Sequence, residues 1–280
     1  MTADDVPDVD ALGMRTLFGD LPGDVDQEAR RVWQYGRLGH LVESDPGGAF
    51  VLEDEEGVCG VSIALVREHV WGLSLFAIDE RLRGHGHGTD LLTASLAYGE
   101  SNACAGWIIL SSEHPAAMRL YAVTARLDVL PCVAAVGIPV LDDAPPQAAQ
   151  VEDAGAGGVD LADAIGREVR GAGHGIDIAA ALRFGARLLT YEDRAFALVR
   201  DANISLLAAR DEEAASAVLW GAWLKPPRSS TAVVCFLTGA QQWAIRAALD
   251  ARLPLSVDSP VMVRGRLGPL VPYVPSGAFL

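Results

Sequence analysis

The sequence has few cationic residues and few cysteines, and each shortage argues against a class of protein. Lys225 is its only lysine, and 37 acidic residues outnumber 22 basic ones, which gives a formal net charge of −15. This charge argues against general binding to nucleic acid or to anionic membranes. The four cysteines form no CxxC pair and stand among apolar residues. We therefore interpret them as reduced core thiols rather than as zinc ligands or disulfides.

Long apolar runs are also missing. No uninterrupted apolar segment is long enough to span a bilayer. The N-terminus, "MTADDVPDVD", is acidic and lacks the basic-then-apolar order of a signal peptide. We therefore expect a soluble, cytoplasmic protein. Half of its 280 residues are hydrophobic, which is enough for a substantial core in two domains of ordinary size or in one large domain.

The middle of the chain has the composition of a linker. Residues 142–158, "DDAPPQAAQVEDAGAGG", are poor in large apolar side chains and rich in Pro, Ala, Gly and acidic residues. This composition predicts one domain over residues 1–141 and another over residues 159–280.

The first half reads as a sheet with helices packed on it. Two β-rich runs flank Glu55-Glu56-Gly57 as a hairpin, and a third strand covers 71–78. A glycine-rich loop and a helical stripe over 89–101 follow. The strand "GWIILSS" and the helix "HPAAMRLYAVTA", with Pro115 in its first turn, complete the order.

The second half repeats this order of elements. "ISLLAA" resembles "LSLFAI", "AVVCFLT" resembles "GWIILSS", and Asp250-Ala251-Arg252-Leu253 falls opposite Thr124-Ala125-Arg126-Leu127. Matching fragments in matching order predict an internal duplication. We expect an α/β (α+β) protein of two similar domains, each a mixed, mostly antiparallel sheet flanked by helices.

The loop "RLRGHGHGTDLL", residues 81–92, is the strongest candidate for a binding site. It lies between a predicted strand and a predicted helix, where free backbone N–H groups and flexible glycines favour an anion. A Walker loop needs a lysine that is absent here, and a dinucleotide loop needs GxGxxG in a βαβ unit. The pattern [RQ]xxGx[GA] is matched at every fixed position by Arg83-Gly84-His85-Gly86-His87-Gly88.

With this loop and its flanking segments, residues from about 10 to 140 resemble a GNAT N-acetyltransferase domain. The resemblance implies that the amides of Arg83, Gly84, His85, Gly86, His87, Gly88 and Thr89 hold the pyrophosphate of acetyl-CoA. It also implies that Phe76, Ala77 and Ile78 pair with the pantetheine arm. This strand and "GWIILSS" would splay apart to admit the thioester.

The family's next motif, N-x-x-A-x-x-x-Y-x-x-x-G-F, is matched in part. Ala117 and Tyr121 agree, while His114 replaces the asparagine and Ala125-Arg126 replaces the final pair. The resemblance implies that Tyr121 is the general acid that protonates the leaving thiolate. The alternative is a tyrosine packed into the core with its hydroxyl satisfied. His114 can still hydrogen-bond to the cofactor.

The general base is open among three carboxylates: Glu113, Glu43 and the C-terminal carboxylate of Leu280, whose apolar tail could tuck back into the fold. No Ser-His-Asp or Cys-His arrangement can be argued from spacing, and the family mechanism needs no covalent intermediate. We expect no metal, because His85 and His87 have no cysteine or carboxylate at ligand spacing.

A near-copy of the glycine loop stands in the second half but in a different context. "VRGAGHGIDIAAAL", residues 169–182, follows a predicted helix and precedes a hairpin, so its glycines are expected to join two helices. After "ISLLAA" stands "RDEEAASAVL", which has no glycine, and Ala247 falls opposite Tyr121. We predict that the second half binds no acetyl-CoA and shapes the acceptor pocket or packs against the first half.

The expected function is transfer of an acetyl or short acyl group from CoA to a primary amine, either a small amine or a peptide. The alternatives are a CoA-binding regulatory or scaffold protein without turnover, and a binding module with an unrelated phosphate loop. The acidic composition suggests an acidic acceptor pocket for a cationic amine. The oligomeric state is left open between monomer and homodimer.

Overall fold

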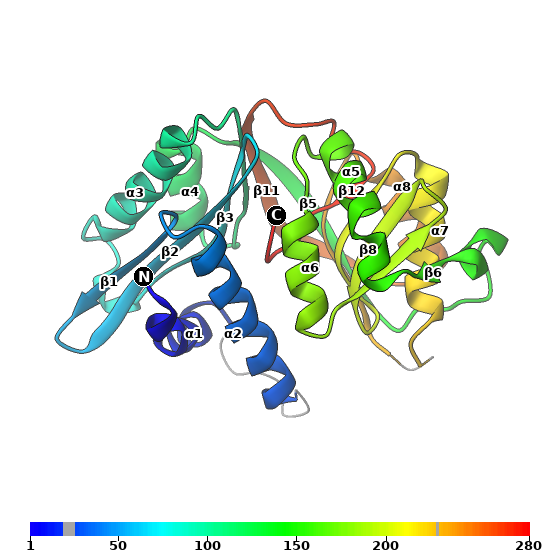
Figure 1. Ribbon diagram of the computed structural model, residues 1–280, viewed down its shortest axis with the longest axis horizontal. Helices are drawn as coiled ribbons and strands as arrows, with labels where there is room; N and C mark the ends of the chain where they lie inside the picture. The colour runs from blue at the N-terminus through cyan, green and yellow to red at the C-terminus, as the bar shows by residue number, and fades with distance from the viewer. Residues whose placement is uncertain (19–25, 228–229) are drawn as a thin grey trace.

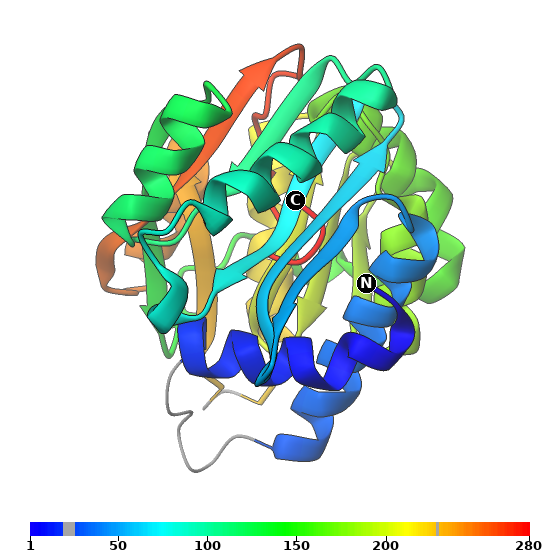
Figure 2. The same ribbon diagram turned by 90° about the vertical axis from the view of Figure 1, so that its left-hand side faces the viewer.

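The computed structural model describes residues 1–18, 26–227 and 230–280, and these residues build one continuous sheet (Figures 1 and 2). The strands run in the order β1-β2-β3-β4-β11-β5-β10-β9-β8-β7-β6, and β12 pairs with β9. The strands are β1 (Ala49–Asp54), β2 (Gly57–Arg67), β3 (Val70–Ile78), β4 (Gly106–Leu110), β5 (Asp128–Gly137), β6 (Glu152–Asp153), β7 (Arg187–Tyr191), β8 (Ala195–Arg200), β9 (Asn203–Ala209), β10 (Ala232–Thr238), β11 (Leu255–Gly265) and β12 (Tyr273–Val274).

Helices cover both faces of this sheet. They are α1 (Val6–Gly13), α2 (Gln27–Ser44), α3 (His87–Ser101), α4 (Pro115–Thr124), α5 (Val159–Val169), α6 (Gly175–Arg183), α7 (Glu212–Leu224) and α8 (Gln242–Asp250). Within the part of the chain that the structure describes, only the pairs β3–β4 and β9–β10 are parallel. The expected mixed, mostly antiparallel sheet flanked by helices is therefore confirmed. Among the described residues, no helix has the length and apolar character that a membrane crossing requires.

The two halves exchange strands at the centre of the sheet. β11, from the second half, lies between β4 and β5 of the first half, and β5 in turn pairs with β10. The strand order is thus symmetric about the β11–β5 pair. The duplication also appears in the backbone, because Arg126 and Arg252, which the sequence placed opposite each other, have φ of 55° and 57°. The sequence analysis did not anticipate β5 and β11 as strands.

Three apolar clusters hold the elements together. α3 and α4 pack on the outer face of the first half, where Leu92, Trp107 and Tyr121 are buried. α7 and α8 cover the second half in the same way, around Trp220 and Trp223. The third cluster is shared, because α1 and α2 on one side and α5 and α6 on the other bury their apolar faces between the halves (Figure 1).

A buried ionic cluster crosses this shared interface. Asp177 of α6 accepts hydrogen bonds from Arg67 Nε at 2.8 Å and Arg67 Nη2 at 2.6 Å, and lies 2.9 Å from His40 Nε2. Arg67 also contacts Asp45 at 2.7 Å. Burial by itself raises the pKa of Asp177, but the hydrogen bonds from His40 and Arg67 outweigh it, so that the pKa lies below its ordinary value.

The segment predicted as a linker has short regular elements of its own. It contains a 3₁₀ turn at Pro146–Gln150, the strand β6 and another turn at Gly155–Gly158. Ala148 and Val151 are buried in the α7 cluster. The domain boundaries on either side of this segment stay a prediction.

Candidate active site

The sheet of the first half opens between β3 and β4. Parallel pairing runs from Val70 opposite Gly106 to Leu73 opposite Ile109, and it ends there. The next residue, Ser74, is the extra residue of a β-bulge, because Ile63 pairs with Leu75 while Ala64 pairs with Leu73. Beyond Ser74, β3 keeps β2 on one side and leaves its other edge free of β4. This is the splayed arrangement that the family resemblance implied.

A cavity of about 1200 Å³ follows this free edge. Its lining comes from both halves. The first half contributes, among others, Phe76, Ala77, Ile78, Ser111 and Tyr121. The second half contributes Arg200, Ile204, Ser205, Cys235 and Phe236, and the tail residues Pro275, Ser276, Gly277 and Ala278 close one side.

The glycine loop forms one end of the cavity. Gly84 and Gly86 have φ of +83° and +94°, a region that glycine enters without the steric cost of a side chain. α3 begins at His87, and Gly86 precedes it without a side-chain cap. The Thr89 N–H already donates to the Gly86 carbonyl at 2.8 Å, which leaves the N–H groups of His87 and Gly88 to bind an anion at the start of α3.

The expected loop residues divide into two groups. Arg83, Gly84, Gly86, Gly88 and Thr89 line the cavity. His85 and His87 are not part of the lining, and their rings lie 6.5 Å apart. Their backbone amides can still face an anion, but their imidazole rings have no place in the cavity wall.

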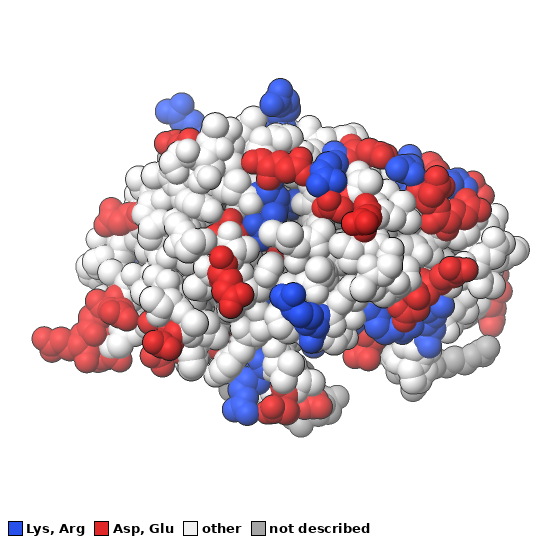
Figure 3. All heavy atoms as spheres, viewed as in Figure 1, with Lys and Arg blue, Asp and Glu red and all other residues white. Residues whose placement is uncertain are grey.

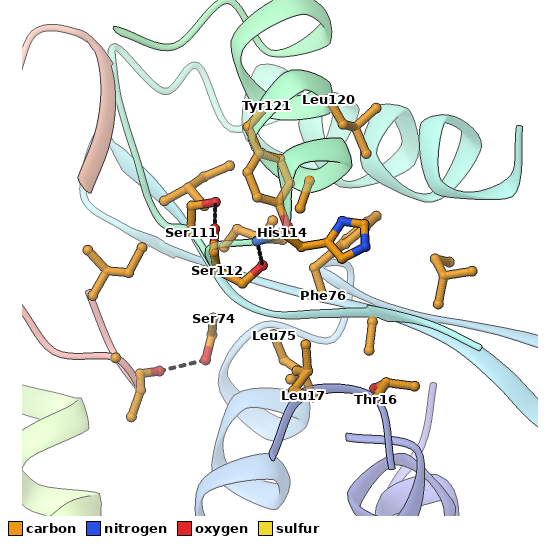
Figure 4. A pocket seen from close by; sticks show the side chains of 18 of the residues that line it. Thr16, Leu17, Ser74, Leu75, Phe76, Ser111, Ser112, His114, Leu120 and Tyr121 are labelled. Carbon is orange, nitrogen blue, oxygen red and sulfur yellow. Dashed lines mark hydrogen bonds between the residues drawn. The ribbon is translucent and has the colours of Figure 1, made fainter. Parts of the chain in front are cut away.

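Tyr121 reaches the cavity from α4. Its side chain is 4 % exposed, and its ring meets Phe76 edge to face at 5.8 Å between centroids. Figure 4 shows the ring pointing from α4 toward Ser111 and Ser112, near the split. Burial raises the pKa of the phenol above its ordinary value. Tyr121 is therefore packed into the core and also lines the cavity, so both interpretations from the sequence apply to it.

His114 caps the helix that carries Tyr121. Its Nδ1 accepts a hydrogen bond from the Ala116 N–H at 3.3 Å, and its ring lines the cavity (Figure 4). The predicted hydrogen bond to a cofactor would have to come from the other ring nitrogen.

The three candidate bases lie elsewhere. Glu113 and Glu43 are exposed and do not line the cavity. Leu280 is buried as the tail tucks into the fold, but its main-chain oxygen accepts hydrogen bonds from Arg170 at 2.9 Å and Tyr273 at 3.0 Å. Within the described residues, no aspartate or glutamate lines the cavity at all.

The expectation of an acidic pocket is therefore wrong. The cavity wall carries Arg30, Arg37, Arg83 and Arg200. Exposed acidic residues lie on the outer surface instead, for example along the tip of the β1–β2 hairpin at residues 53–56, at the left of Figure 3. The negative net charge of the chain says nothing about its interior, because arginines can be buried selectively.

Ser74, Arg37 and Arg200 are site residues that the sequence analysis missed. Arg37 Nη1 donates to Ser74 Oγ at 3.0 Å, and Ser74 Oγ donates to the carbonyl of Ala278 at 2.6 Å (Figure 4 shows the second bond). The guanidinium of Arg200 lies 4.5 Å from the ring centroid of Trp33. One sequence signal could have indicated Arg37: it falls four residues after Trp33 and therefore lies on the same face of the helix.

The equivalent split in the second half is filled by the chain itself. β9 and β10 pair only at Asn203 opposite Val233. Tyr273 and Val274 of β12 then pair with Ala208 and Leu207. Ala208 and Leu207 are the counterparts of Ala77 and Phe76. The strand edge that is free in the first half is therefore covered by β12 in the second half.

The helix N-terminus of the second half is also occupied. Asp211 caps α7 by accepting from the Ala214 N–H at 2.9 Å, and it pairs with Arg194 at 2.8 Å. The glycine-rich copy lies between α5 and α6, as predicted. Its Arg170 is buried and donates to main-chain carbonyls, Phe279 among them.

Comparisons with known proteins agree with this geometry. Residues 14–123 match the model of the Acetyltransferase (GNAT) family. A comparison with curated protein sequences finds no significant match.

Solved structures resemble nearly the whole chain. A putative acetyltransferase from Pyrococcus horikoshii is 15% identical, with a TM-score of 0.75 over 100% of this chain and 94% of that one. A GCN5-related N-acetyltransferase from Kribbella flavida is 16% identical, with a TM-score of 0.60 over 95% and 70%. A tandem GNAT protein from the clavulanic acid biosynthesis pathway is 11% identical, with a TM-score of 0.52 over 95% and 97%. At these identities the likeness concerns the fold.

Proposed function

Because residues 14–123 belong to the GNAT acetyltransferase family and the whole chain has the fold of tandem GNAT proteins, we propose that this protein is an N-acetyltransferase. It moves an acetyl or short acyl group from CoA to a primary amine by direct attack. The observation that carries the proposal is one cavity that joins a free strand edge, an open helix N-terminus and a buried tyrosine.

The residues present fit acetyl-CoA, which would supply an activated acetyl thioester. The N–H groups at the start of α3 and the loop from Arg83 to Thr89 would hold its pyrophosphate. The free edge of β3 at Phe76, Ala77 and Ile78 offers backbone groups to the amides of the pantetheine arm. Gly88 faces the cavity beside Phe76 and Ile78, which leaves room at the first turn of α3.

Tyr121 is the proposed general acid. The amine nitrogen attacks the thioester carbonyl, the carbon–sulfur bond breaks, and the departing thiolate takes the phenolic proton. The proton that the nitrogen loses as it becomes an amide passes to solvent, and the phenolate takes a proton back from solvent. An acid must be protonated before the reaction. The raised pKa of Tyr121 keeps it so at neutral pH.

The amine must be uncharged when it attacks. Arg37 and Arg200 disfavour a second positive charge nearby, so they lower the pKa of an ammonium bound beside them. Water can then take the proton from this ammonium group. The reaction needs no carboxylate base in this arrangement, and Glu113, Glu43 and Leu280 are free of that role.

The second half is proposed to bind no acetyl-CoA and to form the acceptor side of the cavity. β12 covers the strand edge where a pantetheine arm would pair, and Asp211 already caps α7. Arg200, Ser205 and Phe236 face the split from this half.

The test is the release of CoA thiol from acetyl-CoA, measured against a panel of primary amines, with calorimetric titration of acetyl-CoA beside it. Binding together with amine-dependent thiol release is the expected result. Binding without release from any amine would instead favour a regulatory or scaffold protein. Absence of binding would contradict the cofactor site itself.

A further inference from the structure

Arg37 is a buried cation with unused hydrogen-bonding capacity at the reaction centre. Its side chain belongs to α2 and the residue is 5 % exposed. Nη1 donates to Ser74 Oγ, while Nε is buried without a hydrogen-bond partner in the part of the chain that the structure describes. A buried donor left unpaired is costly, so such a group points to a ligand that completes it.

No carboxylate of the described chain neutralises Arg37. The nearest acidic influence is Asp10, but both oxygens of Asp10 are held by Arg30, at 3.0 and 2.7 Å. Burial lowers the pKa of Arg37 to about 10, partly offset by Asp10. The guanidinium therefore stays charged at neutral pH while its positive charge has no ion-pair partner.

Arg200 brings a second, half-buried cation from the other half. Its guanidinium stacks over Trp33, one helical turn before Arg37 on α2. No salt bridge joins Arg200 to any described residue. Burial lowers its pKa, with Asp201 acting in the opposite direction. Two arginines from different halves thus line one cavity, and neither forms a salt bridge with any residue that the structure describes.

The cofactor's pyrophosphate does not account for these cations. Arg37 contacts Ser74, whereas the phosphate loop follows Ile78. Four residues of extended strand span about 13 Å. Arg37 therefore lies at the split between β3 and β4 and not beside the loop.

We propose that the acceptor is an amino acid whose carboxylate binds Arg37 and Arg200, close to the amine that is acetylated. This inference rests on the proposed function, since it names the substrate class of the same site. A guanidinium fork matches a planar carboxylate, and Ser74 occupies only one of the N–H donors of Arg37. The short link from Arg37 through Ser74 to the split favours an amine near the carboxylate.

The experiment compares the twenty common L-amino acids with their amides, in which the carboxylate becomes neutral. Thiol release from acetyl-CoA gives kcat/KM for each compound. We expect about tenfold or greater preference for the acids, as for a charge-assisted hydrogen bond. Arg37→Met, which replaces the buried cation by an apolar chain, and Arg200→Gln should each remove this preference. Arg31→Gln, on the exposed face of α2 where Arg31 pairs with Glu28, should retain it.

The outcomes separate the two proposals. Equal or better use of the amides would overturn the carboxylate subsite and leave the acetyltransferase intact, as would a preference for phosphoethanolamine over every amino acid. If no amine is acetylated, the acetyltransferase proposal fails. The carboxylate subsite is then tested separately, by calorimetric binding of the amino acids and their amides to CoA-saturated protein. Tighter binding of acids that is lost in Arg37→Met would support it, and equal binding would overturn it.

Discussion

Ser74 and Ser205 occupy the same position in the two halves of the molecule. Each is the extra residue of a bulge, in β3 and in β9, and both line the same cavity. Only beside Ser74 does the strand edge stay free, because β12 covers its counterpart beyond Ser205. The two halves therefore line one cavity together, and the edge beyond Ser205 is covered.

This asymmetry predicts one acetyl-CoA per chain. Calorimetric titration should give a stoichiometry near one, because the edge at Leu207 and Ala208 is already paired and three acidic residues, 211–213, stand at the start of α7. A stoichiometry near two would contradict the assignment of the second half.

Gly88 offers a direct test of the phosphate site. An added Cβ would meet only ordinary contacts, at 3.7 Å from Leu120 and 3.8 Å from Ile78 and Phe76. Gly88→Ala should therefore fold as wild type does and weaken acetyl-CoA binding less than a charged side chain at the same position. Gly88→Glu places a carboxylate at the N-terminus of α3, where it suits the helix but repels a pyrophosphate. We expect calorimetry to show at least about tenfold weaker binding, and unchanged affinity would refute the site.

Tyr121→Phe tests the general acid. The phenyl ring keeps the packing against Phe76, so the affinity for acetyl-CoA should change little. The value of kcat should fall about 100-fold, the low end for loss of a general acid. The control is Tyr98→Phe, whose hydroxyl contacts Asp45 instead of the cavity. Equal kcat in Tyr121→Phe and wild type would remove Tyr121 from the mechanism.

The pH dependence of the rate follows from the same tyrosine. A raised pKa means that the phenol loses its proton only above the ordinary value of about 10 for tyrosine. The wild-type rate should therefore show no alkaline decline attributable to this acid below about pH 10. A decline near neutral pH that disappears in Tyr121→Phe would contradict the assignment.

Asp177 should make stability depend on acid. Its pKa is lower in the folded than in the unfolded chain, so its stabilising effect is complete above the unfolded value of about 3.9 and is lost as pH falls through the folded value. Asp177→Asn should reduce the free energy of unfolding at pH 7 by about 3 kcal/mol, because it leaves Arg67 with a weakened buried partner.

Urea unfolding between pH 3 and pH 7 measures this effect. The exposed Asp250→Asn should stay within about 0.5 kcal/mol of wild type. Asp177→Asn should also show a smaller loss of stability in acid. If both variants lost the same amount, the ionic cluster between the halves would not stabilise the fold as described.

Local sequence patterns, chiefly hydrophobic periodicity and turn residues, predicted much of this fold. The hairpin around Glu55-Glu56-Gly57, the helical stripe over 89–101 and the strand over Ala232–Thr238 follow from periodicity and turn residues. The strand exchange could not be predicted from local pattern. Pro131 and Pro260 stand inside β5 and β11 and weaken their strand pattern, and no local feature indicates that these strands pair across the halves. Such pairings depend on contacts remote in sequence.

The candidate site was predictable only where a motif carries it. The glycine loop and Tyr121 have fixed spacings, and the structure places both at one cavity. Arg37 and Arg200 come from a helix and a strand far apart in the chain, so no spacing relates them. The expectation of an acidic pocket was wrong because the net charge of a chain does not say which charged residues line a cavity.

The most direct test of the central claim follows an isotopically labelled acetyl group. Protein, labelled acetyl-CoA and the amino acid panel are incubated, and mass spectrometry measures the N-acetyl product against released CoA. Our account predicts one labelled N-acetyl amino acid for each CoA released, with wild type about 100-fold faster than Tyr121→Phe. CoA release without any labelled amide, in a protein that binds acetyl-CoA, would contradict it.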